Sequence, residues 1–148
     1  RGFKPEDFAR SHPGGSLGRR LLTHVGDVMR SGEGVPRVGL TATFSELMQE
    51  MSRKGLGASA VVDAAGRAVG VFTDGDLRRL IEKGQDLRAL TAGDVMHASP
   101  RTIAQDALAV EAAEMMEKYR ITSLLVVDAQ GLLCGAINTN DLMRAKVI

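Results

Sequence analysis

The sequence predicts an α/β (α+β) fold in which two β-α-β-β-α units pack through their sheets. First, the chain repeats itself: VGDVM at 25–29 returns as AGDVM at 92–96, and SAVVDAAGRAVGVFTDGDLRR at 59–79 returns as LLVVDAQGLLCGAINTNDLMR at 124–144. Second, each copy alternates short apolar runs with amphipathic, capped segments. Third, a unit of roughly 60 residues buries little core alone, so two units are expected to share one.

The first unit contains signals for every element of this order. We expect a short strand near Val38–Leu40, a helix over 43–55, strands over 58–63 and 68–72, and a helix over 73–84. Thr43 and Glu46 have the spacing of a capping box, which fixes the start of the first helix. Gly55 and Gly84 follow the periodic stretches and are typical of helix ends.

The second unit repeats the pattern. We expect a helix from Asp106 to about Tyr119, strands over Leu124–Val127 and Leu132–Ile137 with a turn at Gly131, and a helix from about Thr139. The predicted organisation is therefore a leading segment at 1–24, a first unit at 25–84, a joint at 85–91 and a second unit at 92–148.

Composition excludes several classes of function. The net charge is only +1, and aromatic residues make up 3% with no Trp, which argues against a nucleic-acid partner. No apolar run approaches the length of about 18 residues that a membrane span needs. Cys134 is the only cysteine, so we expect a reducing, cytoplasmic location. His24 and His97 belong to no His/Cys cluster, so we expect no metal and no cofactor.

The stretch FTDGDL at 72–77 is the best candidate for a binding site. A predicted strand runs directly into a helix, whose free amides and dipole favour an anion. The hydroxyl of Thr73 can bind a phosphate, and the carboxylate of Asp76 can accept both hydroxyls of a ribose. The alternative is that both residues only cap the helix.

Other candidates are weaker. Asn138 and Asp141 occupy the matching positions of the second unit, where NTNDL is also an ordinary capped helix start. Arg78, and Arg79 beside it, can neutralise a phosphate or carboxylate, or lie on a solvated face. Gly57 and Thr122 precede the buried strands and are either places of close ligand approach or simple turn residues.

A β-α-β-β-α unit that ends in GVFTDGDL resembles the cystathionine-β-synthase (CBS) domain, whose signature is Gly-hydrophobic-x-Thr/Ser-x-x-Asp. Gly70, Thr73 and Asp76 satisfy it in the first unit. In the second unit Gly135 and Asp141 fit, but Asn138 stands where Thr or Ser is expected. The resemblance covers residues 25–148 and implies a tandem pair, or Bateman module, that binds a nucleotide.

The leading segment resembles a different kind of domain. FARSHPGGSLGRRLL at 8–22, followed by GDVM, is similar to the D-arabinose 5-phosphate isomerases of the KpsF/GutQ type, in which a sugar-isomerase (SIS) domain precedes a CBS pair. Residues 1–24 would then be the end of the SIS domain. The resemblance implies a catalytic role for His12 in the parent enzyme only, because the rest of the active site is absent; we expect this chain alone to be inactive.

The resemblance also implies partners. The isomerases convert ribulose 5-phosphate to arabinose 5-phosphate for the Kdo of lipopolysaccharide or capsule, so pathway logic favours CMP-Kdo as a feedback ligand for the CBS pair. The alternatives are an adenine-nucleotide energy sensor and a ligand-free oligomerisation module. CBS pairs commonly dimerise, and the parent isomerases resemble tetramers, so at least a dimer is expected.

Overall fold

The computed structural model describes residue 18 and residues 21–148. Its elements follow in this order: α3 (Val25–Val28), the 3-10 turn η1 (Gly32–Gly34), β1 (Arg37–Gly39), α4 (Phe44–Lys54), β2 (Ala58–Val62), β3 (Ala68–Thr73), α5 (Asp74–Glu82), α6 (Ala92–Val95), β4 (His97–Ala98), β5 (Thr102–Ala104), α7 (Ala109–Tyr119), β6 (Ser123–Val127), β7 (Leu133–Asn138) and α8 (Thr139–Arg144).

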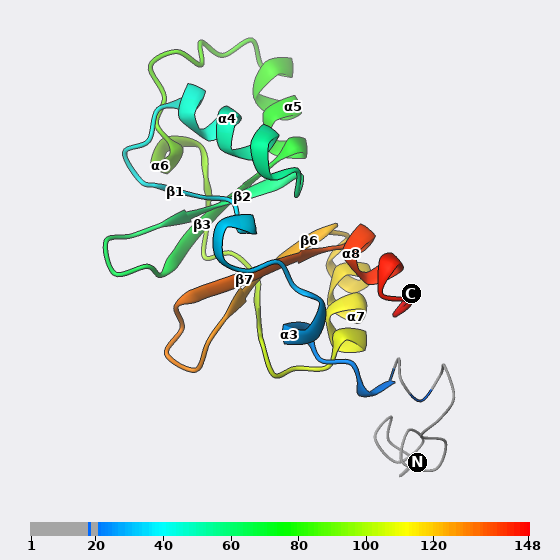
Figure 1. Ribbon diagram of the computed structural model, residues 1–148. Helices are drawn as coiled ribbons and strands as arrows, with labels where there is room; N and C mark the ends of the chain where they lie inside the picture. The colour runs from blue at the N-terminus through cyan, green and yellow to red at the C-terminus, as the bar shows by residue number, and fades with distance from the viewer. Residues whose placement is uncertain (1–17, 19–20) are drawn as a thin grey trace.

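Both copies of the β-α-β-β-α order are present, which confirms the predicted fold class (Figure 1). One boundary is wrong: the helix expected from Asp106 begins at Ala109. Residues 104–107 close a turn instead, with Ala107 N donating to Ala104 O at 3.1 Å. The carboxylate of Glu111 accepts from Leu108 N at 2.8 Å and thereby fixes the later start. No helix in the described part of the chain is long and apolar enough to cross a membrane.

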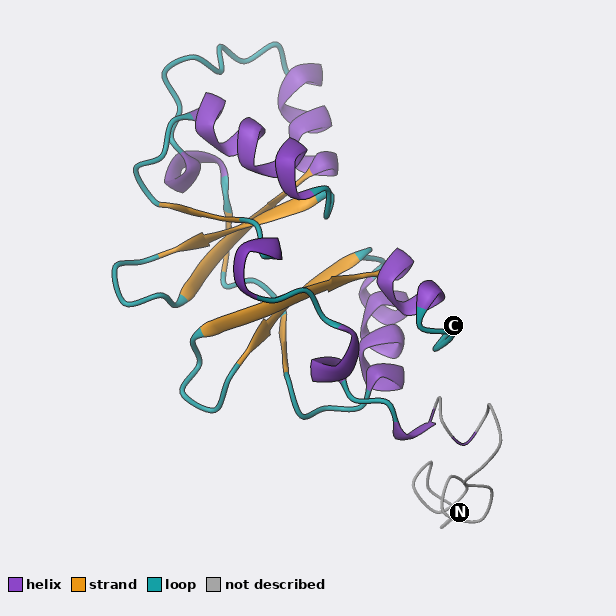
Figure 2. Ribbon diagram, in the orientation of Figure 1, coloured by secondary structure: helices purple, strands orange, loops and turns teal. Residues whose placement is uncertain are grey.

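Two sheets face each other at the centre, with helices on their outer sides (Figure 2). The first has the order β1-β2-β3-β4 and the second the order β5-β6-β7. In each, a parallel pair precedes an antiparallel hairpin. The facing surfaces are lined by small and branched residues, among them Ala58, Ala60, Leu125 and Ala136, which form one buried cluster. Neither sheet would bury this face alone, as the shared-core prediction requires.

The segment that opens each sequence repeat packs on the other repeat. Helix α3 packs against α7 and β7, whereas α6 packs against β1 and β3. Strand β4, which follows α6, pairs with β3 of the first unit. Correspondingly, Arg30 pairs with Ala136 of β7. The two units are therefore interleaved. The residue directly after each GDVM segment lies against the opposite unit.

A methionine and a glycine form the contact at each of these crossings. A Cβ atom built on Gly70 would lie 2.2 Å from Met96 Sδ. On Gly135 it would lie 2.3 Å from Met29 Sδ. Each GDVM methionine thus lies against the signature glycine of the other unit, where only a residue without a side chain leaves room for it.

Glu50 on α4 is a buried carboxylate held by three donors. It accepts from Arg37 N at 3.0 Å, from Lys54 Nζ at 2.9 Å and from Arg53 Nη2. Burial raises the pKa of Glu50, but these hydrogen bonds more than compensate, so its pKa lies below the ordinary value. The ionised carboxylate therefore ties the end of α4 to the entrance of β1.

We expect Glu50→Gln to lower the free energy of unfolding by about 2 kcal/mol at pH 7, because hydrogen bonds to a charged acceptor are lost. A lowered pKa in the folded state stabilises the fold above the unfolded pKa of about 4.3, and this contribution disappears as pH falls through the folded value. Urea denaturation at pH 7 and at about pH 3.5 should therefore show a difference that shrinks in acid.

Glu46→Gln on the same helix is the matched control. Glu46 is exposed and accepts only from Thr43 N, and glutamine retains that capping bond. Its effect should stay within about 0.5 kcal/mol. A pH-independent loss in Glu50→Gln would contradict the assignment of the effect to the ionised carboxylate.

Candidate ligand-binding clefts

The first motif opens into a cleft of about 700 Å³ between the two units. Its walls come from four segments: Gly57 before β2, strand β3 with the start of α5, residues 97–101 after α6, and residues 120–125 before and within β6. The predicted site residues that line it are Gly57, Thr73, Asp76, Arg78 and Thr122. The structure therefore brings together five of the candidates and separates Asn138 and Asp141 from them.

Thr73 and Asp76 form a complete capping box at the start of α5. Asp76 N donates to Thr73 Oγ1 at 3.2 Å, and Thr73 N donates to Asp76 Oδ2 at 2.9 Å. Thr73 and Asp76 therefore cap the helix, as the alternative interpretation of the sequence predicts. This capping leaves the hydroxyl proton of Thr73 free to donate into the cleft, because in the box this oxygen acts as an acceptor.

The second oxygen of Asp76 is held by two exposed side chains. Arg79 Nη2 lies 2.6 Å and His97 Nε2 2.8 Å from Asp76 Oδ1. The side chains of Arg79 and His97 are 63% and 68% exposed, whereas that of Asp76 is 7% exposed. Burial raises the pKa of Asp76, but the bonds from Thr73, Arg79 and His97 outweigh it and hold the pKa below its usual value. The carboxylate is ionised, and the two side chains bonded to its Oδ1 are themselves largely exposed.

Positive charge dominates the cleft. Its charged lining residues other than histidine are Arg78, Arg79, Arg101, Arg120, Asp74 and Asp76. Arg101 and Arg120 come from the second unit and were not identified from the sequence. Arg101 lies over the ring of Tyr119, 3.4 Å from its centroid, which orients the guanidinium. The excess of arginines suits an anion with more than one charge.

Gly57 and Thr122 serve first as backbone acceptors. Gly57 O accepts from Asp74 N at 3.1 Å, and Thr122 O accepts from Thr139 N at 3.0 Å. Gly57 has φ +89°, a conformation that favours glycine. Both residues therefore have a structural role at the start of the following helix, and both also line the first cleft.

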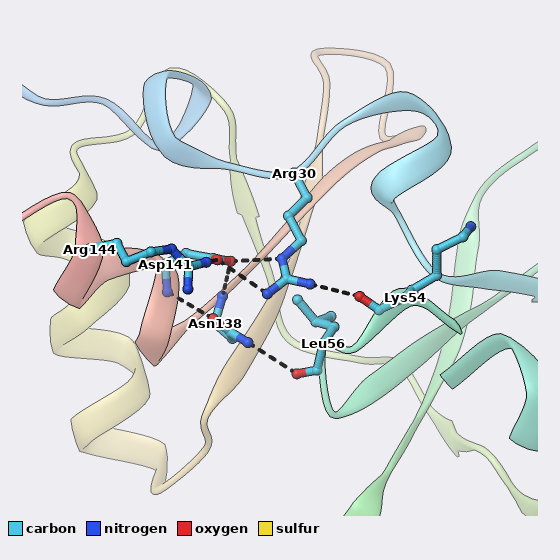
Figure 3. Close-up of polar contacts among 6 residues, drawn as sticks. All are labelled: Arg30, Lys54, Leu56, Asn138, Asp141 and Arg144. Atoms are coloured by element: carbon cyan, nitrogen blue, oxygen red, sulfur yellow. Dashed lines mark hydrogen bonds and ion pairs between the residues drawn. The ribbon is translucent and has the colours of Figure 1, made fainter. Parts of the chain in front are cut away.

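The second motif has an internal occupant (Figure 3). Arg30 Nε and Nη2 donate to the two oxygens of Asp141 at 3.1 and 3.2 Å, and Arg30 Nη1 donates to Lys54 O at 2.9 Å. The Asn138 amide donates to Leu56 O at 3.3 Å. The polar groups considered for a nucleotide at this motif are thus bonded to the protein itself.

Arg30 and His97 are counterparts. Each is the residue directly after a GDVM repeat, and each reaches the aspartate of the motif on the opposite unit. His97 has no metal-ligand spacing and Arg30 lies outside any motif, so neither was among the predicted site residues. The signal that identifies both is their equal place in the repeat, combined with the crossing of the two units.

Some candidates lie elsewhere. His12 is outside the described residues. Among the residues that the structure describes, no group of three or more His, Cys, Asp or Glu side chains is arranged to hold a metal ion. The first cleft is therefore the strongest candidate site in the described part of the chain.

Comparison with known proteins adds sequence relatives. The sequence model of the family described as CBS domain matches residues 25–83 and 92–148. Arabinose 5-phosphate isomerase KdsD of Pseudomonas aeruginosa is 50% identical over 148 residues, and KdsD of Escherichia coli is 45% identical over the same length. These matches cover 100% of this chain and 45% of each relative, so the chain spans less than half of their length.

Solved structures share the fold. CBSX2, a CBS-pair protein of Arabidopsis thaliana solved in complex with AMP, has a TM-score of 0.70 and 26% identity over 84% of this chain and 96% of that one. The CBS domain protein PAE2072 of Pyrobaculum aerophilum has a TM-score of 0.72 and 24% identity over 80% and 89% of the two chains.

Proposed function

The chain belongs to the CBS-domain family, as a tandem pair, and from that premise we propose that it is the regulatory module of an arabinose 5-phosphate isomerase and senses an anionic nucleotide. The observation that carries this is the first cleft, in which the ionised Asp76 lies among four arginines from both units. A ligand in it contacts both halves and can therefore bias their relative position, which is what a regulatory module requires.

The chemistry of the cleft specifies the parts of the ligand. A ribose diol would replace Arg79 and His97 as donors to Asp76 Oδ1. Both side chains are exposed and can move away from this oxygen when the ligand binds. The freed Arg79, together with Arg78, Arg101 or Arg120, would then pair with phosphate or carboxylate oxygens. A nucleotide that bears a second anionic group satisfies both ends of the cleft.

CMP-Kdo fits this description, since it joins a ribonucleotide to a sugar acid. The similarity to arabinose 5-phosphate isomerases over the whole chain supports an end product of their pathway as ligand. An adenine nucleotide is the second candidate, because CBSX2, at 26% identity, was solved in complex with AMP. The isomerase activity itself would belong to the remainder of the parent protein, with His12 as a catalytic residue there.

We expect Asp76→Asn to weaken nucleotide binding at least tenfold, about 1.4 kcal/mol, because one acceptor for the ribose is lost while the capping geometry is retained. Isothermal titration calorimetry with CMP-Kdo, CMP, AMP and ATP measures this directly. Tighter binding of CMP-Kdo than of CMP supports end-product sensing, and binding of AMP or ATP alone supports energy sensing.

Asp94→Asn is the matched control. Asp94 forms the same capping box with Thr91 on α6, but it is exposed and does not line the cleft. Its dissociation constant should equal that of the natural chain. Unchanged binding in Asp76→Asn, or no binding of any of the four nucleotides to the natural chain, would refute the proposed site.

Self-association forms part of the same proposal. Ile81 on α5 and Met143 on α8 are 61% and 52% exposed, which leaves apolar surface on the last helix of each unit. A second copy of the pair would cover them in a dimer, and tetramers would follow in the parent protein. If the chain dimerises in sedimentation experiments but binds no nucleotide, the ligand-free oligomerisation module becomes the better account.

A further inference from the structure

We propose that the residue after each GDVM repeat decides which motif is open to a ligand: His97 leaves the first cleft open, and Arg30 closes the second motif with the chain's own guanidinium. The chain then binds one nucleotide. This inference rests on the proposed function for the ligand class, but the closure of the second motif is a separate claim about Arg30.

The guanidinium of Arg30 binds the carboxylate of Asp141 as a free cation would. It engages both oxygens of Asp141 in a two-pronged contact, the strongest kind of charge-assisted hydrogen bond. The third nitrogen donates to Lys54 O, at the end of α4 in the first unit. The Arg30 side chain is only 22% exposed. The acceptors that a ribose would need at Asp141 are therefore occupied.

The backbone also fixes Arg30 in this position. Arg30 N donates to Ala136 O at 2.8 Å, and Ala136 N donates to Arg30 O at 3.1 Å. The backbone of Arg30 is thus paired with β7, and its side chain is bonded to Asp141 and to Lys54 O. Moving it aside would break the contacts to Asp141 and Lys54 together, which a ligand must offset before it gains any contact of its own.

His97 has the equivalent backbone position, but its side chain makes fewer contacts than that of Arg30. Its segment pairs with β3, opposite Val71, as that of Arg30 pairs with β7. Its shorter side chain reaches one oxygen of Asp76 with one nitrogen and remains 68% exposed. The cleft beside it has a volume of about 700 Å³, which is within the range of small-molecule sites. A single exposed contact is easily exchanged for a ribose hydroxyl.

The test exchanges the two residues. Calorimetric titration of the 148-residue chain with CMP-Kdo, CMP and AMP should give one site in the natural chain. His97→Arg should weaken binding at the first cleft at least tenfold, because an arginine there can hold Asp76 as Arg30 holds Asp141. Arg30→His should raise the number of sites from one to two, and Arg30→His with Asp141→Asn should return it to one.

Two controls keep these outcomes interpretable. His24→Arg introduces the same change outside the cleft, and its dissociation constant should not move. Thermal melting of every variant verifies that it is folded; histidine at 30 can still donate to Asp141, which protects that variant from the larger loss expected for alanine.

The proposal is overturned if the natural chain binds two nucleotides, if His97→Arg binds as tightly as the natural chain, or if folded Arg30→His gains no site. If the natural chain binds none of the three nucleotides, the proposed function fails, and Arg30→His still decides this inference. A site that appears in that variant and disappears with Asp141→Asn supports closure by Arg30, and the absence of any new site refutes it.

Discussion

Arg30→Ala is expected to lower the free energy of unfolding by about 3 kcal/mol, because it removes one partner of a buried ion pair. Asp141, whose side chain is 5% exposed, loses both donors of the Arg30 guanidinium. Lys54 O loses its donor at the same time. Asn138 N still donates to Asp141 Oδ2 at 3.0 Å, but the remaining cation, Arg144, lies on the surface and compensates little. Chemical denaturation at neutral pH measures the change.

Arg144→Ala separates the buried contact from the exposed one. Arg144 also binds Asp141 Oδ1, but its side chain is 69% exposed. Exposed ion pairs contribute about 0–1 kcal/mol, so this variant should lie within that range. If Arg30→Ala costs no more than Arg144→Ala, the guanidinium of Arg30 does not hold the two units together.

The fold could be predicted because its signals are local. The repeat, the capping residues Thr43 and Thr73, and the apolar runs of the paired strands all lie within short windows. The start of α7 was missed because two local signals competed there: Asp106 is a good capping residue, but the turn at 104–107 and the carboxylate of Glu111 move the start to Ala109.

The site could be predicted only in part, because its other half is distant in sequence. Thr73 and Asp76 carry a recognisable spacing. Arg101 and Arg120, by contrast, reach the same cleft from the second unit, and Arg30 reaches Asp141 across 111 positions. A local sequence pattern does not predict which residues of one unit reach the other. This crossing follows from the packing of each GDVM segment on the opposite unit, which the sequence contains only as a methionine and a distant glycine.

Gly135 and Met29 form one of these contacts. Gly135→Ala is expected to lower the free energy of unfolding by about 2–3 kcal/mol through overpacking. The new Cβ would lie 2.3 Å from Met29 Sδ and 2.9 Å from Arg30 O. The methionine side chain can move, but the carbonyl belongs to backbone paired with Ala136 and cannot retreat without breaking that pairing. Thermal and urea denaturation report the loss.

Two further variants identify its cause. Gly39→Ala introduces the same group at the end of β1, where nothing lies within 4 Å, and should change the stability by no more than about 0.5 kcal/mol. Met29→Ala combined with Gly135→Ala removes the contact with sulfur but not the one with Arg30 O, so it should be less destabilised than the two single losses added together. Additive losses would mean that Met29 and residue 135 do not touch. Coupling between them would establish that the signature glycine accommodates the methionine of the opposite unit.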